Sequence, residues 1–167
     1  MSQDPEFAPT LVDDIINYLK AGVPRGYFLA FFYGDPLDIP ISYMPCIAVE
    51  LLREQIIQGP TGQDKIISTV QVKLIYNKRD DFGKTPDEVL GVRKLEQFAK
   101  GIDPVTLEYD TRTIASILRK NFTLGQLITN EDMIVNYGIV QRPNDELTAE
   151  CRISVAIEQY IMVTGRQ

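Results

Sequence analysis

The chain of 167 residues carries 23 acidic and 17 basic side chains, a net charge of −6, and no histidine. The acidic balance argues against a basic nucleic-acid-binding surface, and the lack of histidine excludes Ser-His-Asp and Cys-His catalytic sites and histidine-based zinc sites. With 44% apolar residues, the composition is that of one globular domain whose core needs neither metal nor disulfide.

The N-terminal part predicts a short arm followed by a helix. Residues 1–9 are polar and contain two prolines, so we expect an arm there and a single domain over residues 10–167. Thr10 and Asp13 have the pattern of a capping box, apolar residues follow at helical spacing, and Gly22 suits the helix end. The aromatic run from Tyr27 to Tyr33 predicts a buried strand, and residues 34–45 a proline-rich loop.

Two long strands follow around a turn. Residues 46–57 are apolar and rich in strand-forming types, residues 58–62 contain two glycines and a proline, and residues 65–76 alternate between apolar and polar side chains. The alternation places Val70, Val72, Leu74 and Tyr76 on one face. Arms of about a dozen residues are long for a strand pair, so the hairpin tip is predicted to project beyond its sheet.

The second half predicts two helices and two closing strands. Thr85-Pro86-Asp87-Glu88 has the residues of a helix start, which predicts a helix to about Lys100. A second helix is predicted over residues 111–120, and strands over residues 133–140 and 147–163. The buried side chains expected from the two helices are Val89, Val92, Leu95 and Ala99, then Ile114, Ile117 and Leu118.

The order of these elements predicts the fold class. Helix, hairpin, two helices and hairpin indicate an α+β domain, with an antiparallel sheet, a long projecting β-hairpin and helices packed on one face of the sheet. The N-terminus lacks the apolar segment of a signal peptide, and no apolar run reaches the length of a membrane span. We therefore expect a soluble protein made in a cytoplasm, with Cys46 and Cys151 as reduced core residues.

Candidate chemical sites are few. The pair Asp13-Asp14 falls in the first turn of a helix, where acidic side chains are ordinary, and Asp80-Asp81 lies among basic residues in a charged loop. Residues 59–62 lack the ending of a phosphate-binding loop. The aromatic run near Tyr27 has too little positive charge around it to favour base stacking. We therefore predict no catalytic residue, no cofactor and no metal site.

The large-scale features instead predict association between copies. The predicted hairpin tip carries Ile56 and Ile57, and an exposed, strand-forming apolar projection is unfavourable in a monomer. The final strand is long, and we expect it to leave an edge with which a partner could pair. Both features suggest homo-oligomerisation through strands.

The layout resembles the phage tail-terminator (tail-completion, neck) proteins. The segments that carry this resemblance are CIAVELLREQI, STVQVKLIYNKRDDFG, TIASILRKNFTL, MIVNYGIV and RISVAIEQYIMV, which lie within residues 10–163. The N-terminal arm and the proline-rich segment 34–45 depart from the family pattern. The resemblance implies a non-enzymatic homohexameric ring that caps the tail tube, ends its polymerisation and offers a surface for head attachment.

The same resemblance implies the partners and the location. The partners are other copies of the chain, the tail tube protein, a head-completion or connector protein, and DNA that passes through the lumen without sequence-specific binding. The location is the virion neck, assembled in the host cytoplasm, with no membrane. The predicted contacts with a neighbouring subunit or the tube lie at the hairpin tip and in a charged loop: Ile56, Ile57, Gln58, Thr61, Lys78, Arg79, Asp80, Asp81 and Phe82.

Two other readings stay open at this point. The first is a head-completion or adaptor subunit of the same neck, which shares the size range. The second is a small α+β enzyme with a carboxylate site, for which Asp80 and Asp81 would be the first candidates. A stand-alone nucleic-acid binder is disfavoured by the net charge.

Overall fold

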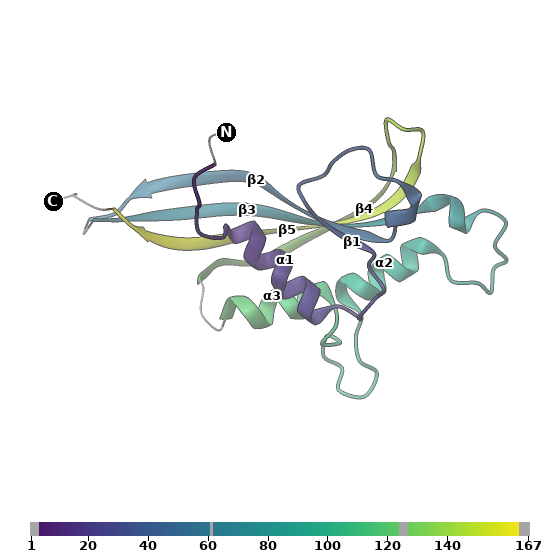
Figure 1. Ribbon diagram of the computed structural model, residues 1–167. Helices are drawn as coiled ribbons and strands as arrows, with labels where there is room; N and C mark the ends of the chain where they lie inside the picture. Colours follow the sequence, from purple (N-terminus) through teal and green to yellow (C-terminus); the bar gives the residue numbers. More distant parts are fainter. Residues whose placement is uncertain (1–3, 61, 124–126, 164–167) are drawn as a thin grey trace.

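The strands of the computed structural model form one mixed sheet in the order β1-β2-β3-β5-β4, with helices α1, α2 and α3 on one face (Figure 1). The structure describes residues 4–60, 62–123 and 127–163. The bounds of its elements are α1 Leu11–Gly22, β1 Ala30–Tyr33, β2 Cys46–Gln58, β3 Gln63–Asn77, α2 Gly91–Lys100, α3 Ile114–Thr123, β4 Leu127–Gln141 and β5 Leu147–Met162. The predicted α+β class is confirmed.

Helix α1 begins and ends where the sequence predicts. The Thr10 hydroxyl accepts a hydrogen bond from the Asp13 backbone N–H, and the Asp13 carboxylate accepts one from the Thr10 backbone N–H at 2.8 Å, which completes the capping box. Gly22 allows α1 to approach α3 closely, since a Cβ at this position would lie 2.6 Å from Ile117 Cγ1. The helix buries its apolar stripe against the sheet.

The core between sheet and helices confirms the alternation predicted for β3. Val70, Val72 and Leu74 are fully buried, together with Cys151 of β5. Helix α3 contributes the three side chains that its periodicity predicts: Ile114, Ile117 and Leu118. Both cysteines are buried as predicted, Cys151 in this core and Cys46 on the other face of the sheet. They are free thiols with no exposed surface, and burial raises the pKa of each to about 12.

Helix α2 begins later than predicted. Thr85 and Glu88 form a turn in which the Thr85 N–H donates to the Glu88 carboxylate at 3.2 Å, and the helix starts at Gly91. The Gly91 N–H donates to Asp81 Oδ1 at 2.7 Å, so a carboxylate from an earlier loop satisfies the helix end. The prediction that Val89 and Val92 are buried is therefore wrong, whereas the burial of Leu95 and Ala99 is confirmed.

The sheet differs from the predicted antiparallel sheet at one edge. The four residues of β1 pair parallel to β2, with Ala30 opposite Cys46 and Tyr33 opposite Val49. The predicted strand from Tyr27 is shorter because Tyr27 and Phe28 instead pack their rings against Phe98 of α2.

The proline-rich segment 34–45 covers part of the second face of the sheet. Ile39 and Met44 from this segment bury Cys46, Ala48 and Ile75 in a second, smaller core. One end of the sheet is thus covered on both faces. The helices lie on one face as predicted, but the cover on the second face was not predicted.

A buried ionic cluster fixes this segment to the sheet. The guanidinium of Arg142 donates to both carboxylate oxygens of Asp35, at 2.7 and 3.0 Å, and to Glu150 at 2.9 Å. Lys73 also donates to Asp35, at 3.0 Å. Burial by itself would raise the pKa of Asp35, but the hydrogen bonds from Arg142, Leu37 and Lys73 lower it well below its usual range. Asp35 therefore stays charged, and its charge holds residues 34–45 in place.

The final strand is not the sheet edge that the sequence suggested. β5 lies between β3 and β4 and pairs with β3 along its whole length, from Asn77 opposite Thr148 to Gln63 opposite Met162. The strands β2 and β3 are antiparallel neighbours, but their far ends do not extend as a two-stranded hairpin, because β5 continues beside them. In the described residues, the open edges of the sheet lie on β4 and, beyond the four residues that pair with β1, on β2.

Candidate interaction surface

The far end of the sheet, built mainly from β2, β3 and β5, extends beyond the helices as a blade, and β4 pairs with β5 only at its base, where Leu127 lies opposite Glu158 (Figure 1). We define the blade as residues 51–58 of β2, 63–69 of β3 and 156–162 of β5. Every blade residue of β2 is exposed, in contrast to residues 46–49 of the same strand, which are buried. We call the rest of the molecule the body. Unlike the body, the β2 part of the blade has no other segment of the described residues packed over its side chains.

Both faces of the blade carry exposed apolar side chains. Ile56 lies opposite Ile66 and is 63% exposed, and Ile161 is 47% exposed on the same face. On the other face, Ile57 lies opposite Lys65, which lies opposite Tyr160. Tyr160 and Met162 are also exposed. Because exposed large apolar side chains that gather on one element are a common feature of protein interaction sites, the blade is the first candidate surface.

An ion pair links two strands of the blade. Lys65 Nζ of β3 lies 2.6 Å from the Glu158 carboxylate of β5, and the Tyr160 hydroxyl donates to the same carboxylate at 2.9 Å. The hydrogen bond from Lys65 lowers the pKa of Glu158. The pair cross-links the blade at its surface and leaves the nearby isoleucines exposed.

The structure places the predicted hairpin-tip residues in one region. Ile56, Ile57 and Gln58 are consecutive exposed residues at the end of β2, and Thr61 lies outside the described residues. Ile56, Ile57 and Gln58 therefore lie in the blade, their role as contact residues stays a prediction, and the sequence analysis did not include Tyr160 and Met162 of β5. These two residues are far from Ile57 in the sequence, and only the pairing of β3 with β2 and β5 brings them close to it.

The second predicted contact, residues 78–82, is a short 3-10 turn and the residue after it, away from the blade. Asp81 is buried and ion-paired with Lys78 at 2.9 Å and Lys84 at 3.6 Å, in addition to its bond with Gly91. Burial by itself would raise the pKa of Asp81, but these partners lower it. Asp81 thus serves the fold. Arg79, Asp80 and Phe82 are exposed, Phe82 by 63%, so contact through this turn stays a prediction.

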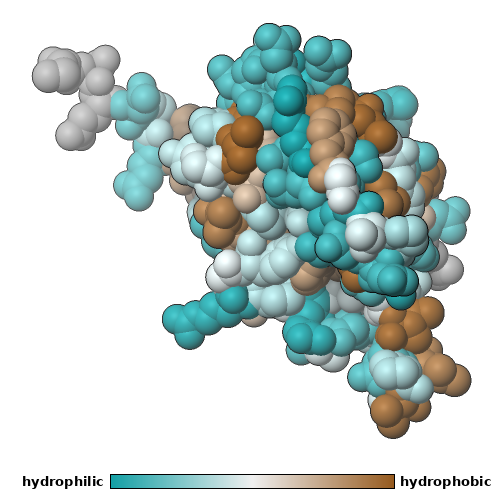
Figure 2. All heavy atoms as spheres, turned by 90° about the vertical axis from the view of Figure 1, so that its right-hand side faces the viewer, coloured by the Kyte–Doolittle hydropathy of each residue, from teal (hydrophilic) through white to brown (hydrophobic). Residues whose placement is uncertain are grey.

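A protruding loop between α2 and α3 is a second apolar surface that the sequence reading missed. Figure 2 shows apolar side chains gathered at the lower end of the molecule, where residues 101–110 project. Val105 is 88% exposed and Leu107 78%. Asp103 fixes the loop, because its carboxylate accepts from the backbone N–H groups of Val105 and Thr106. Leu107 adopts a φ of +59°, which is unusual for a residue with a side chain.

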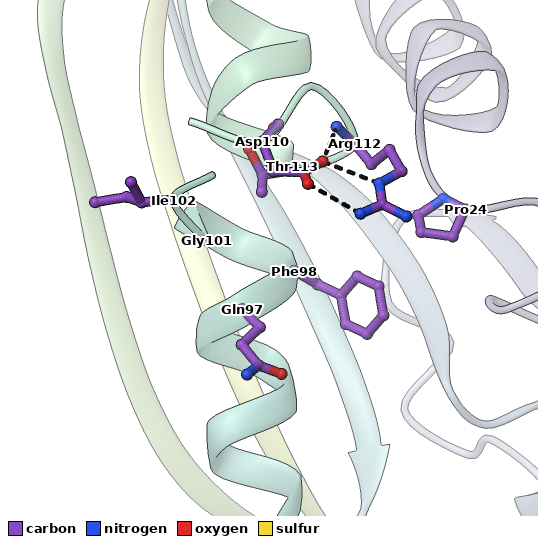
Figure 3. A pocket seen from close by; sticks show the side chains of 8 residues that line it. All are labelled: Pro24, Gln97, Phe98, Gly101, Ile102, Asp110, Arg112 and Thr113. Carbon is purple, nitrogen blue, oxygen red and sulfur yellow. Dashed lines mark hydrogen bonds and ion pairs between the residues drawn. The ribbon is translucent and has the colours of Figure 1, made fainter. Parts of the chain in front are cut away.

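A groove of about 420 Å³ lies at the foot of this loop (Figure 3). Its lining includes Phe98 and Ile102, and its charged side chains, Asp110 and Arg112, face each other. Arg112 donates to both carboxylate oxygens of Asp110, at 3.0 and 2.9 Å, and these bonds lower the pKa of Asp110 to about 2. Since the two charges neutralise each other, the groove suits an apolar group better than an anion.

No protein-family model and no curated protein matches this chain. Within the described part of the chain, no group of three or more His, Cys, Asp or Glu side chains is placed to hold a metal ion. None of the helices described is both long enough and apolar enough to cross a membrane.

Proposed function

We propose that this chain is a non-enzymatic structural subunit of a phage neck, of the tail-terminator kind. Copies of the chain form a homohexameric ring that caps the tail tube, ends its polymerisation and presents a surface to the head-side connector. The observation that carries this proposal is the blade, whose two faces expose apolar side chains in a single chain.

The blade supports assembly for an energetic reason. Complete burial of an isoleucine or methionine side chain contributes about 1.5–3 kcal/mol, and Ile56, Ile161 and Met162 leave about half or more of their surface in water. Contact with a neighbouring subunit or the tube would bury these side chains, and this burial would stabilise the assembly. The predicted partners are those of a ring at the head-tail junction: other copies, the tail tube and the connector. The net charge of −6 suits a lumen through which DNA passes without binding.

The first experiment measures the assembly state of the purified chain by native mass spectrometry and negative-stain imaging. We expect closed rings with sixfold symmetry. The variant Ile56→Lys places a charge on the blade and should reduce the rings to monomers. The matched control is Ile41→Lys, because Ile41 is a 44% exposed isoleucine of the body and its replacement should leave the rings intact. A wild-type chain that stays monomeric at high concentration contradicts the proposal.

The second experiment separates the terminator from the adaptor of the same neck. Tails assembled without the chain should become overlong, and added chain should restore their normal length. Tails of normal length that fail to join heads would instead assign the chain to head completion.

A further inference from the structure

Strand β4 forms an open edge of the sheet. In the described residues no strand pairs with its outer side, and most of its side chains from Met133 to Gln141 are exposed. Ile134 is 61% exposed and Ile139 57%. This stretch contains neither a charged residue nor a proline, the usual features that keep an edge strand from pairing with another chain. β4 is therefore suited to pairing.

The other edge of the same sheet is open along the blade. β1 covers β2 only from Cys46 to Val49, and in the described residues no strand pairs with the outer side of residues 51–57. One chain thus presents two open strand edges on opposite sides of one sheet.

We infer that the outer edge of β4 in one copy pairs with the outer edge of residues 51–57 of β2 in the next copy, and so continues the sheet from subunit to subunit. This inference rests on the proposed function and identifies the surfaces that build the ring. The occupant is a second copy because one head-to-tail contact, repeated around a ring, satisfies both open edges. A two-fold pairing of β4 with β4 would leave the edge of β2 open.

The topology fixes the relative direction of the paired strands. β2 is antiparallel to β3, β3 to β5 and β5 to β4, so β2 and β4 run in opposite directions. Where neighbouring subunits keep the same strand direction around an axis, β4 and the next β2 meet antiparallel. This is the geometry of an ordinary antiparallel ladder.

The side chains select a register. Ile134 lies opposite Ser154, and Ile57 lies opposite Lys65, which lies opposite Tyr160. Ser154 and Tyr160 share one face of β5, so Ile134 and Ile57 also share a face. With Ile134 opposite the neighbour's Ile57, Val135 meets Ile56 on the other face. Apolar side chains then meet on both faces.

This register also gives the stagger that a closed ring needs. Ser154 and Tyr160 are six residues apart on β5, which corresponds to about 20 Å along a strand. From β4 of one copy to β4 of the next, the sheet crosses four strand spacings of about 4.8 Å each, or about 19 Å. The resulting slope of about 45° agrees with the strand tilt of about 35–45° in closed barrels.

The test is disulfide trapping between single-cysteine additions. The native Cys46 and Cys151 are fully buried, so exposed thiols come only from the new residues. Under mild oxidation, an equal mixture of Ile57→Cys and Ile134→Cys chains should yield disulfide-linked heterodimers, and neither variant alone should yield linked dimers. Ile139→Cys is the matched control, because Ile139 is a 57% exposed isoleucine of the same strand that faces the opposite side of the sheet and should not link to Ile57→Cys.

A charge exchange gives an independent readout. Ile134→Lys should lose the oligomer, and Ile57→Glu added to the same chain should restore it, because every contact then holds one lysine and one glutamate. Both positions are exposed in the single chain, so thermal melts should show that each variant folds.

The outcomes separate this inference from the proposed function. Linked dimers of Ile134→Cys alone, or closed rings without a 57–134 link, overturn the edge pairing. Linked open chains without rings keep the pairing and overturn the ring. Monomers under all conditions overturn both.

Discussion

The body and the blade of this protein are built from the same strands and differ in what covers them. In the body, helices cover one face of β2 and β3 and residues 34–45 cover the other. In the blade, the same β2 exposes isoleucines on both faces. The role of a residue in this sheet therefore depends on what covers it and not on the strand to which it belongs. Residues of the body hold the fold, whereas the isoleucines at the blade end of β2 stay exposed in the single chain, and we propose that they serve assembly.

The largest effect is expected where the body buries charge. Arg142→Leu leaves the buried carboxylates of Asp35 and Glu150 without their main partner, so the free energy of unfolding should fall by about 3–5 kcal/mol. Urea denaturation measures this loss. The control is Arg152→Leu, whose guanidinium lies 3.7 Å from Glu150 on a 40% exposed side chain and should contribute about 1 kcal/mol or less. Equal losses in both variants would contradict a dominant role for Arg142.

One strand allows a direct comparison of body and blade. Ile47 is fully buried and Ile56 is 63% exposed on the same strand. Ile47→Ala should lower the free energy of unfolding by about 2–5 kcal/mol because it leaves a cavity. Ile56→Ala should lower it by about 1 kcal/mol or less and should instead weaken assembly, measured by native mass spectrometry. If Ile56→Ala unfolds the monomer as strongly as Ile47→Ala, the blade belongs to the core and the comparison fails.

The sequence predicted the features of this fold that arise from local patterns. Alternation identified the buried face of β3, and periodicity identified the buried side chains of α3. The start of α2 was missed because Thr85 and Glu88 form only a turn, while the carboxylate that caps the helix comes from Asp81. The position of β5 inside the sheet was missed because strand order depends on long-range pairing, which local patterns do not encode.

Local patterns predicted part of the candidate surface, but not the parts that depend on long-range contacts. A run of apolar residues at a strand end pointed to Ile56 and Ile57. The covered second face was not predictable, because it depends on Arg142 reaching Asp35, which is 107 positions away in the sequence. The open edge of β4 follows from the strand order, so it could not be identified before that order was known.

A smaller effect should appear in the acid response of the body. The folded-state pKa of Asp35 is lowered, so its stabilising contribution is fully present above its unfolded pKa of about 3.9 and is lost as pH falls toward the lowered value. Asp35→Asn should therefore flatten the decrease in unfolding free energy between pH 4 and pH 2. The measurement is urea denaturation at several pH values in that range. Ile41→Ala, an exposed position of the same segment with no ionisable side chain, is the control and should leave the slope unchanged.

The smallest effect concerns the loop of residues 101–110, the other exposed apolar surface. Leu107 is held at a φ of +59°, a conformation that costs a residue with a side chain about 1–2 kcal/mol. Leu107→Gly should relieve this cost and, after the loss of backbone entropy, raise the free energy of unfolding by about 0.5–1 kcal/mol. Val105→Gly is the control, because Val105 has no positive φ and should become slightly less stable. Thermal melts compare the two variants, and an equal response would show that the backbone at Leu107 stores no strain. If the Leu107→Gly chain is more stable but no longer assembles, the loop is a second contact surface in addition to the blade.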